Sequence, residues 1–465
     1  MDHQPDQSSV YVTAIDILKQ RFGNRLSTGQ AVREQHGHTT TWIENMPPDA
    51  VVFAKSHDDI VTVVEVCAAH RVPVVAFGAG TSLEGQVNAP RGGVCIDTTG
   101  MNRIISVNAE DLDCVVEPGV SRKQLNDYLR DQGLFFSVDP GAEDATIGGM
   151  AATRASGTTA VRYGTMRDNV LNMTVVMADG STVRTARRAR KSSAGYDLTH
   201  LMVGSEGTLG IMTELTVRVH GIPETILAAV CPFETMDGAC NTVIQAIQLG
   251  LGLARMEFLD EVQVKAVNAY SGLDMREAPT LFLEFHGTPA GTREQVETFR
   301  EIAEAEGAQA FDWAEEAEDR NKLWKARHDA YWAGRALRPG VDALSTDICV
   351  PISKLAECVT ETKADIVASG MIAPVVGHVG DGNFHVLPLV DMANPDEVAT
   401  VKAFLDRLNE RALACDGTCT GEHGIGMGKQ KYLHAELGPG VAIMKAVKTA
   451  LDPDGIMNPG KIFRD

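Results

Sequence analysis

The chain has 465 residues and a formal net charge of -20, and its 42 lysines and arginines form no long basic run. The length suggests two or three domains, and the acidic balance argues against nucleic acid as a partner. The nine cysteines include no CxxC pair, so reduced thiols are expected rather than a disulfide framework or a zinc finger.

The N-terminus lacks the basic and apolar regions of a signal peptide and the arginine-rich pattern of an import sequence. No run of eighteen apolar residues predicts a transmembrane segment. A cytoplasmic protein is therefore expected, with peripheral association with a respiratory membrane left open.

Residues 50–221 alternate strands, helices and glycine loops. "DAVVFAKS" reads as a strand, and Ser56 with Asp59 resembles a capping box that opens a helix. "VPVVAFGAG" is a buried strand that runs into glycine, and "DCVVEPGV" is a strand followed by a helix that Ser121 caps. "NVLNMTVVMADGSTVRT" predicts a hairpin through Asp179-Gly180, followed by a long strand in "GTLGIMTELTVRV".

Two glycine-rich segments in this region are candidates for holding a large ligand. "FGAGTSLEG", residues 77–85, resembles a dinucleotide fingerprint, but Pro90 and Gly92-Gly93 exclude the helix that a Rossmann unit requires next. The small residues of 140–164 are typical either of a flexible linker or of close backbone approach to phosphates, and the flanking strands favour the second interpretation.

From Ile222 onward the pattern changes to strands and longer helices. The strands "ILAAVCPF", "ARMEFLD" and "LFLEFHG" are separated by helices, one of them beginning at Arg293, which predicts helices on one face of an antiparallel sheet.

The stretch "GHVGDGNFH" predicts a hairpin with Asp381-Gly382 as a two-residue turn. That register places His378 opposite His385 and buries Val379 and Phe384 on the other face. Two facing imidazoles can bind one metal ion, although an ordinary polar contact is the alternative.

Glu422 and His423, in the glycine-flanked loop "TGEHGIG", can add a third metal ligand and a base, because adjacent side chains on extended backbone point in opposite directions. Taken alone, this segment reads as a surface loop.

Arg327 lies on a predicted helix with Tyr331 one turn further on the same face. A carboxylate substrate requires a guanidinium of this kind, whereas a solvated helix charge is the alternative interpretation.

Several segments together resemble one flavoprotein family: "PVVAFGAGTSLEGQV", "PGAEDATIGGMAATRASGTTAVRYGT", "VGSEGTLGI", "STDICVPISKL", "GHVGDGNFH", "GTCTGEHGIGMGK" and "DPDGIMNPGK". The chain is similar, over roughly residues 45 to 465, to the cytochrome-linked FAD-dependent D-lactate dehydrogenases. These group with the glycolate oxidase flavoprotein subunit and D-2-hydroxyglutarate dehydrogenase in the vanillyl-alcohol-oxidase-like superfamily.

The resemblance implies an α+β fold with a two-part FAD-binding domain of the vanillyl-alcohol-oxidase (PCMH) type and a ferredoxin-like substrate cap. The implied parts are an N-terminal helical segment (1–45), the FAD-binding domain (46–221), the cap domain (222–415) and a C-terminal segment (416–465) that completes the active site. It also implies a divalent metal, Zn, Mn or Fe, on His378, His385 and Glu422, with His423 as base and Arg327 binding the substrate carboxylate. The implied flavin contacts are Gly78, Gly80, Thr81, Ser82, Gly85, Pro140, Gly141, Thr146, Gly149, Ala152, Ser156, Gly157, Glu206 and Ile211.

Two differences from relatives in this family narrow the expected mode of flavin attachment and the expected substrate class. Thr81-Ser82 stand where covalently flavinylated relatives carry a histidine, so FAD should be non-covalent, and "ALSTDICVP" lacks the lysine that hydroxyglutarate dehydrogenases carry there, so a monocarboxylate is favoured. The expected reaction is oxidation of a D-2-hydroxy acid such as D-lactate, with a quinone, cytochrome or electron-transfer flavoprotein as acceptor. A glycolate or D-2-hydroxyglutarate dehydrogenase, a metal-dependent hydrolase and a non-catalytic flavin carrier are the alternatives.

Overall fold

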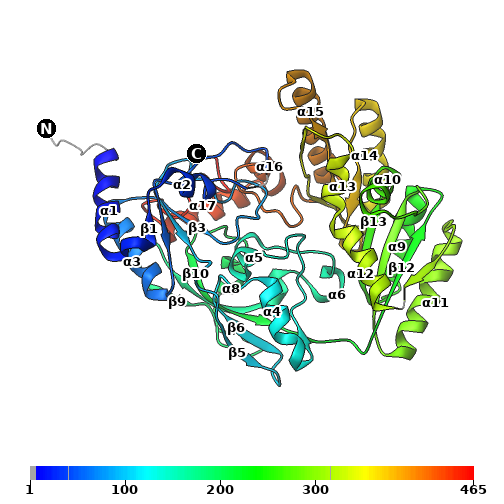
Figure 1. Ribbon diagram of the computed structural model, residues 1–465, viewed down its shortest axis with the longest axis horizontal. Helices are drawn as coiled ribbons and strands as arrows, with labels where there is room; N and C mark the ends of the chain where they lie inside the picture. Colours follow the sequence, from blue (N-terminus) through cyan, green and yellow to red (C-terminus); the bar gives the residue numbers. More distant parts are fainter. Residues whose placement is uncertain (1–6, 40, 315, 465) are drawn as a thin grey trace. The chain divides into compact units, whose positions relative to one another are not determined.

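The computed structural model describes residues 7–39, 41–314 and 316–464 (Figure 1). The chain forms two compact units. The first unit comprises Met1–Ala155, Thr165–Ile222 and Glu422–Asp465, and the second comprises Ser156–Gly164 and Pro223–Gly421. The expected N-terminal segment 1–45 includes residues 1–6 and 40, which lie outside the described residues. Among the described residues, no helix has the length and apolar character needed to cross a bilayer.

The first unit is built on two main sheets. The four-stranded sheet has the order β1-β2-β4-β3, in which β4 pairs in parallel with both β2 and β3, and the five-stranded antiparallel sheet has the order β5-β6-β10-β8-β9. Its strands are β1 (Leu26–Ser27), β2 (Ala50–Phe53), β3 (Val74–Phe77), β4 (Val94–Asp97), β5 (Ile104–Asn108), β6 (Asp113–Val116), β7 (Leu134–Phe135), β8 (Val170–Val176), β9 (Thr182–Arg184), β10 (Ile211–Arg218) and β11 (His220–Gly221).

The helices of the first unit begin where the sequence supplies caps. Ser56 accepts a hydrogen bond from the Asp59 amide at the start of α3, and Ser121 accepts one from the Gln124 amide at the start of α4, as predicted. The predicted hairpin through Asp179-Gly180 is confirmed by the pairing of β8 with β9. The helices are α1 (Gln7–Phe22), α2 (Gln30–Gln35), α3 (His57–His70), α4 (Arg122–Leu129), α5 (Ile147–Thr153), α7 (Met166–Asn169), α8 (Leu198–Met202), α16 (Gln430–Leu437) and α17 (Gly440–Leu451).

The second unit contains a seven-stranded antiparallel sheet in the order β15-β12-β14-β13-β18-β19-β17. Its strands are β12 (Thr225–Pro232), β13 (Leu253–Leu259), β14 (Thr280–Gly287), β15 (Asp312–Ala314), β17 (Ile348–Cys349), β18 (Val375–Gly377) and β19 (Asn383–Val386), and β16 (Asp342–Ala343) pairs separately with β20 (Leu389–Val390). Its helices are α6 (Ala160–Tyr163), α9 (Met236–Gln248), α10 (Glu261–Ser271), α11 (Pro289–Ala305), α12 (Ala317–His328), α13 (Ala330–Ala336), α14 (Leu355–Ser369) and α15 (Pro395–Ala414).

Helices cover both faces of this sheet, which corrects the expectation of one covered face (Figure 1). Leu281 and Leu283 of β14 pack into the core with α9, α11 and α14, whereas Phe282 packs on the other face with α10, α12 and α13. Both faces of β14 are buried, although only the face with Leu281, Leu283 and Phe285 is apolar throughout. On the other face Phe282 lies beside the buried polar pair of Glu284 and His286, so the polar residues of this strand do not mark a solvent-exposed face. The α+β class is confirmed, but α11 begins at Pro289 rather than Arg293.

Candidate functional site

The first glycine segment follows β3 as a loop in the first unit. Gly80 and Gly85 have φ values of +66° and +74°, in the left-handed region that glycine adopts without strain. A Cβ added at Gly78 would lie 2.4 Å from Thr146 Oγ1, so this loop and the second small-residue segment approach too closely for a larger side chain. The Ser82 hydroxyl is buried and has no hydrogen-bond partner among the described residues. A backbone cradle with an orphaned hydroxyl fits a phosphate-bearing cofactor.

The second segment is divided between the two units. Thr146 caps α5 by accepting a hydrogen bond from the Gly149 amide, and the Ala152 carbonyl accepts one from the Glu206 amide at 2.9 Å, so the expected contacts at Thr146, Gly149, Ala152 and Glu206 lie in one connected part of the first unit. Ser156 and Gly157 instead belong to the segment Ser156–Gly164, which packs in the second unit.

Glu206 binds backbone amides of the loop that follows His423. Its two carboxylate oxygens accept hydrogen bonds from the amides of Ile425 and Gly426, at 2.7 and 2.8 Å. Glu206 itself has φ +53°, a strained value for a residue with a side chain. Burial raises the pKa of Glu206 to about 7, against the opposing effect of the two amides. The carboxylate therefore anchors the backbone of the 422–428 loop.

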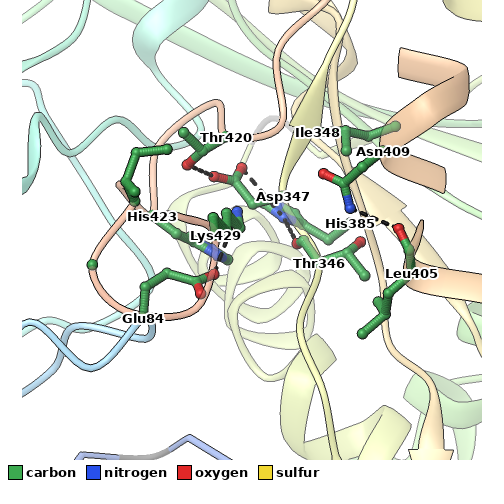
Figure 2. A network of polar contacts seen from close by, with 12 residues as sticks. Glu84, Thr346, Asp347, Ile348, His385, Leu405, Asn409, Thr420, His423 and Lys429 are labelled. Atoms are coloured by element: carbon green, nitrogen blue, oxygen red, sulfur yellow. Dashed lines mark hydrogen bonds and ion pairs between the residues drawn. The ribbon is translucent and has the colours of Figure 1, made fainter. Parts of the chain in front are cut away.

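A second contact fixes this loop directly at the proposed base. The Gln86 side-chain amide donates to the His423 carbonyl at 2.8 Å, so the backbone of His423 is held by the segment that follows the first glycine loop. Lys429 at the end of the loop pairs with Glu84 at 3.3 Å (Figure 2). The glycine loop and the 422–428 loop are thus joined within the first unit.

In the second unit, the predicted hairpin forms with a different register. His385 pairs with Val376 rather than His378, because residues 379–381 form a 3-10 turn and Gly382 adopts φ +79° after it. The expected two-residue turn is therefore wrong. The two imidazoles are nevertheless neighbours, with ring centroids 5.3 Å apart, and Val379 and Phe384 are both buried in the core as predicted.

Both histidines bind an acceptor through Nδ1. His378 Nδ1 lies 2.9 Å from each carboxylate oxygen of Glu257, and His385 Nδ1 lies 2.7 Å from the Thr346 carbonyl (Figure 2 shows the second contact). Because a carbonyl and an ionised carboxylate can only accept, Nδ1 carries the proton in both neutral rings and Nε2 carries the lone pair. Metal-binding histidines show this arrangement, so the donor set fits a divalent cation.

Asp347 contacts the segment of the chain that leads directly to Glu422. Its carboxylate accepts a hydrogen bond from the side-chain amide of Asn383 at 2.9 Å. It accepts a second from the Thr420 hydroxyl at 2.8 Å (Figure 2). The Asp347 carbonyl accepts the Gly421 amide at 3.3 Å. Glu422 follows Gly421 directly, so the covalent chain brings the expected third ligand to within one residue of this network.

Arg327 is almost fully buried, with 7 % of its surface exposed, and its guanidinium pairs with Glu257. Its Nε has no hydrogen-bond partner among the described residues. A buried donor of this kind suits a substrate carboxylate. The expectation that Tyr331 continues the same helix is wrong, because α12 ends at His328 and α13 begins at Ala330.

Sequence reasoning missed Glu257 and Asp347. Glu257 lies inside the otherwise apolar strand "ARMEFL" and Asp347 precedes the short strand β17, and both side chains are buried. A single acidic residue within a buried strand was the available signal, because such a carboxylate requires a partner.

Comparison with known proteins identifies the family. Residues 48–186 match the FAD binding domain model, and residues 222–462 match the model of the C-terminal domain of FAD linked oxidases. The chain is 52% identical to the probable mitochondrial D-lactate dehydrogenase of Danio rerio, over 94% of this chain and 89% of that protein. It is 46% identical to the mitochondrial D-lactate dehydrogenase [cytochrome] of Arabidopsis thaliana, over 97% of this chain and 80% of that protein.

The fold has solved counterparts. A crystal structure of p-cresol methylhydroxylase with bound substrate superposes with a TM-score of 0.81, at 18% identity, over 98% of this chain and 97% of that chain. This likeness confirms the expected fold class.

The cytoplasmic location expected above is wrong, because both D-lactate dehydrogenase relatives are mitochondrial proteins by name. The two domain matches and the two relatives show that this chain belongs to the family of FAD-linked oxidases.

Proposed function

We propose that this chain is an FAD- and divalent-metal-dependent dehydrogenase that oxidises D-2-hydroxy monocarboxylic acids, such as D-lactate, to 2-oxo acids. The observation that carries the proposal is the histidine pair, in which Nδ1 of His378 and Nδ1 of His385 each have a hydrogen-bond acceptor. The acceptor of His378, the Glu257 carboxylate, also pairs with the buried Arg327. The names of the two D-lactate dehydrogenase relatives supply the substrate class.

The proposed metal ligands are His378 and His385 through Nε2, with Glu422 as the third ligand. Two imidazoles and one carboxylate suit zinc, manganese or iron, and leave positions for substrate oxygens. A bound divalent cation supplies Lewis acidity that lowers the pKa of a coordinated hydroxyl group. The buried partners of the histidines fix both rings before any ligand arrives.

The remaining steps belong to this chain's own side chains. Arg327 binds the substrate carboxylate through guanidinium N–H groups that Glu257 does not occupy. His423 takes the proton of the C2 hydroxyl, since histidine exchanges protons near neutral pH. Oxidation at C2 would draw on bound FAD for the chemistry of hydride acceptance. The proposed flavin contacts are those implied by the family resemblance, and Thr81-Ser82 in place of a histidine favours non-covalent attachment.

A monocarboxylate is the proposed substrate because the connection between β16 and β17 reads Leu344-Ser345-Thr346-Asp347, with no lysine for a second carboxylate. The name of the Arabidopsis relative supports a cytochrome as electron acceptor. Glycolate and D-2-hydroxyglutarate are the alternative substrates. A metal-dependent hydrolase or a flavin carrier is less well supported, because the first would not need the glycine cradle and the second would not need the histidine pair.

The test is turnover with an artificial electron acceptor and each purified acid, with the 2-oxo product identified. We expect D-lactate to be oxidised to pyruvate at least about 100-fold faster than either L-lactate or D-2-hydroxyglutarate is oxidised. We expect the variant His423→Asn to retain flavin and metal and to lose turnover. If none of the acids is converted to a 2-oxo product, the proposal is contradicted.

Acid precipitation tests how the flavin is attached. It should release the flavin into the supernatant, and flavin retained in the pellet would contradict non-covalent attachment.

A further inference from the structure

Glu257 occupies a central position in the second unit. It lies in β13, which pairs with β14 on one side and β18 on the other, and its surface is 0 % exposed. Phe258 is opposite Gly377 in the antiparallel pairing of β13 with β18, so residue 257 stands beside residue 378. The sheet register therefore dictates that a side chain at 257 meets His378.

The surroundings of this carboxylate are two cationic or proton-donating side chains. His378 Nδ1 is 2.9 Å from both oxygens, and the Arg327 guanidinium pairs with Oε2. Transferring a charged carboxylate into a protein interior is costly, and a buried ion pair is seldom more stabilising than apolar residues of the same volume. Stability alone therefore gives a poor reason for a glutamate here.

We infer that Glu257 is a positioning residue that sets the tautomer of His378 and the orientation of Arg327 at the same time. The inference rests on the function proposed above. A carboxylate bound to Nδ1–H holds the lone pair on Nε2 and increases the basicity of that nitrogen. The same carboxylate pairs with Nη2 of the guanidinium, so the Nε N–H, which has no partner among the described residues, is presented in a fixed direction.

The two histidines differ in a way that makes the inference testable. His385 donates to the neutral carbonyl of Thr346, whereas His378 donates to a charged side chain. Removing the charge at 257 therefore changes one proposed metal ligand and the arginine together, and leaves the other ligand as it is. A purely structural role would affect stability without this combined effect.

The experiment compares Glu257→Gln with Glu284→Gln. Glu284 is also a buried carboxylate on the same sheet, paired with Arg255 at 3.5 Å and with His286 at 2.7 Å, and it has no place in the proposed site. Both variants should keep the flavin spectrum. For Glu257→Gln, we expect Zn²⁺ and Mn²⁺ affinity, measured by titration with the metal alone, to fall about 10- to 100-fold. The KM for D-lactate at saturating metal should rise, while Glu284→Gln changes neither quantity.

A measurement on the wild-type protein keeps the inference falsifiable if the variant does not fold. Nitrogen-15 NMR of labelled histidine in the metal-free protein should report the Nδ1–H form for His378. The Nε2–H form in the wild type, or unchanged metal affinity and KM in Glu257→Gln, would overturn the inference. If D-lactate fails to reduce the wild-type flavin, the proposed function falls, whereas the tautomer and the metal affinity still test the role of Glu257.

Discussion

The two units present their proposed ligands in different ways. In the first unit the cradle consists of glycines and backbone amides, with Gly80 in the left-handed region and Gly78 against Thr146. In the second unit the proposed site consists of directed side chains on and beside the sheet, namely the half-buried His378, the buried His385 and their acceptors. A large cofactor needs close approach along its length, whereas a small substrate and a metal need a few directed charges. The difference predicts that substitutions in the two units cause separable losses.

The largest expected effect is in the side-chain site. Arg327→Lys removes the planar fork and should lower kcat/KM for D-lactate about 100-fold, the equivalent of about 3 kcal/mol, because charge-assisted hydrogen bonds are lost. Flavin content should stay at the wild-type level. Arg300→Lys, at a half-exposed arginine of α11 in the same unit, is the matched control and should leave kcat/KM unchanged. Near-normal kcat/KM in Arg327→Lys would remove this arginine from the site.

The backbone cradle should fail in the opposite way. Gly80→Ala places a side chain at φ +66°, which costs about 1–2 kcal/mol, and its Cβ would lie 2.7 Å from the Phe77 ring. We expect flavin occupancy after gel filtration to fall below half, with metal affinity retained. Gly221→Ala, where a Cβ would meet no atom within 4 Å, is the control. Full flavin occupancy in Gly80→Ala would contradict the proposal that the glycine loop of the first unit holds the flavin.

Glu206 is a buried carboxylate in the first unit, where the other expected cofactor contacts are mainly backbone groups. Glu206→Gln replaces one of two acceptors by a donor that faces an amide N–H, at a cost of about 1–3 kcal/mol. We expect hydrogen exchange at Ile425 and Gly426 to accelerate about tenfold or more, while flavin content changes little. Glu214→Gln on β10 should leave this exchange unchanged. Loss of flavin with unchanged exchange would favour direct contact between Glu206 and flavin.

The smallest expected effect concerns His220 in the first unit. Burial lowers the pKa of His220 to about 4, with a further contribution from Arg218. The unfolded chain, with a histidine pKa of about 6.5, therefore binds more protons between pH 4 and 6.5, so the free energy of unfolding falls on acidification through that range. His220→Gln should reduce this loss, as measured by urea unfolding at pH 5 and pH 7. If the free energy of unfolding of the variant falls as much between pH 7 and pH 5 as that of the wild type, His220 is not the source of the acid sensitivity.

The sequence predicted the elements well where local signals decide them. The caps at Ser56 and Ser121 and the turn at Asp179-Gly180 all appear where their residue types require. The register at His378 was wrong because the Asp-Gly signal predicts a two-residue turn, while a 3-10 turn at residues 379–381 lengthens the connection. Such a turn depends on tertiary pairing, here between Asn383 and Cys349, which local sequence does not report.

The sequence offers the two histidines and the arginine as candidate site residues, but not the carboxylate that contacts His378 and Arg327. Glu257 lies on β13 and meets His378 only through the pairing of β13 with β18, and Arg327 reaches it from α12. Residues 257, 327 and 378 are far apart along the chain, and no spacing rule links them. The cytoplasmic expectation rested on the absence of recognisable targeting patterns, and such an absence carries little weight against named relatives.

The most direct test of the central claim is the visible spectrum of the purified, metal-supplemented protein under anaerobic conditions, before and after addition of L-lactate and then D-lactate. We expect an oxidised flavin spectrum that L-lactate leaves unchanged and D-lactate bleaches. A flavin spectrum that D-lactate leaves unchanged, or a protein that holds no flavin after reconstitution, would contradict the proposed activity.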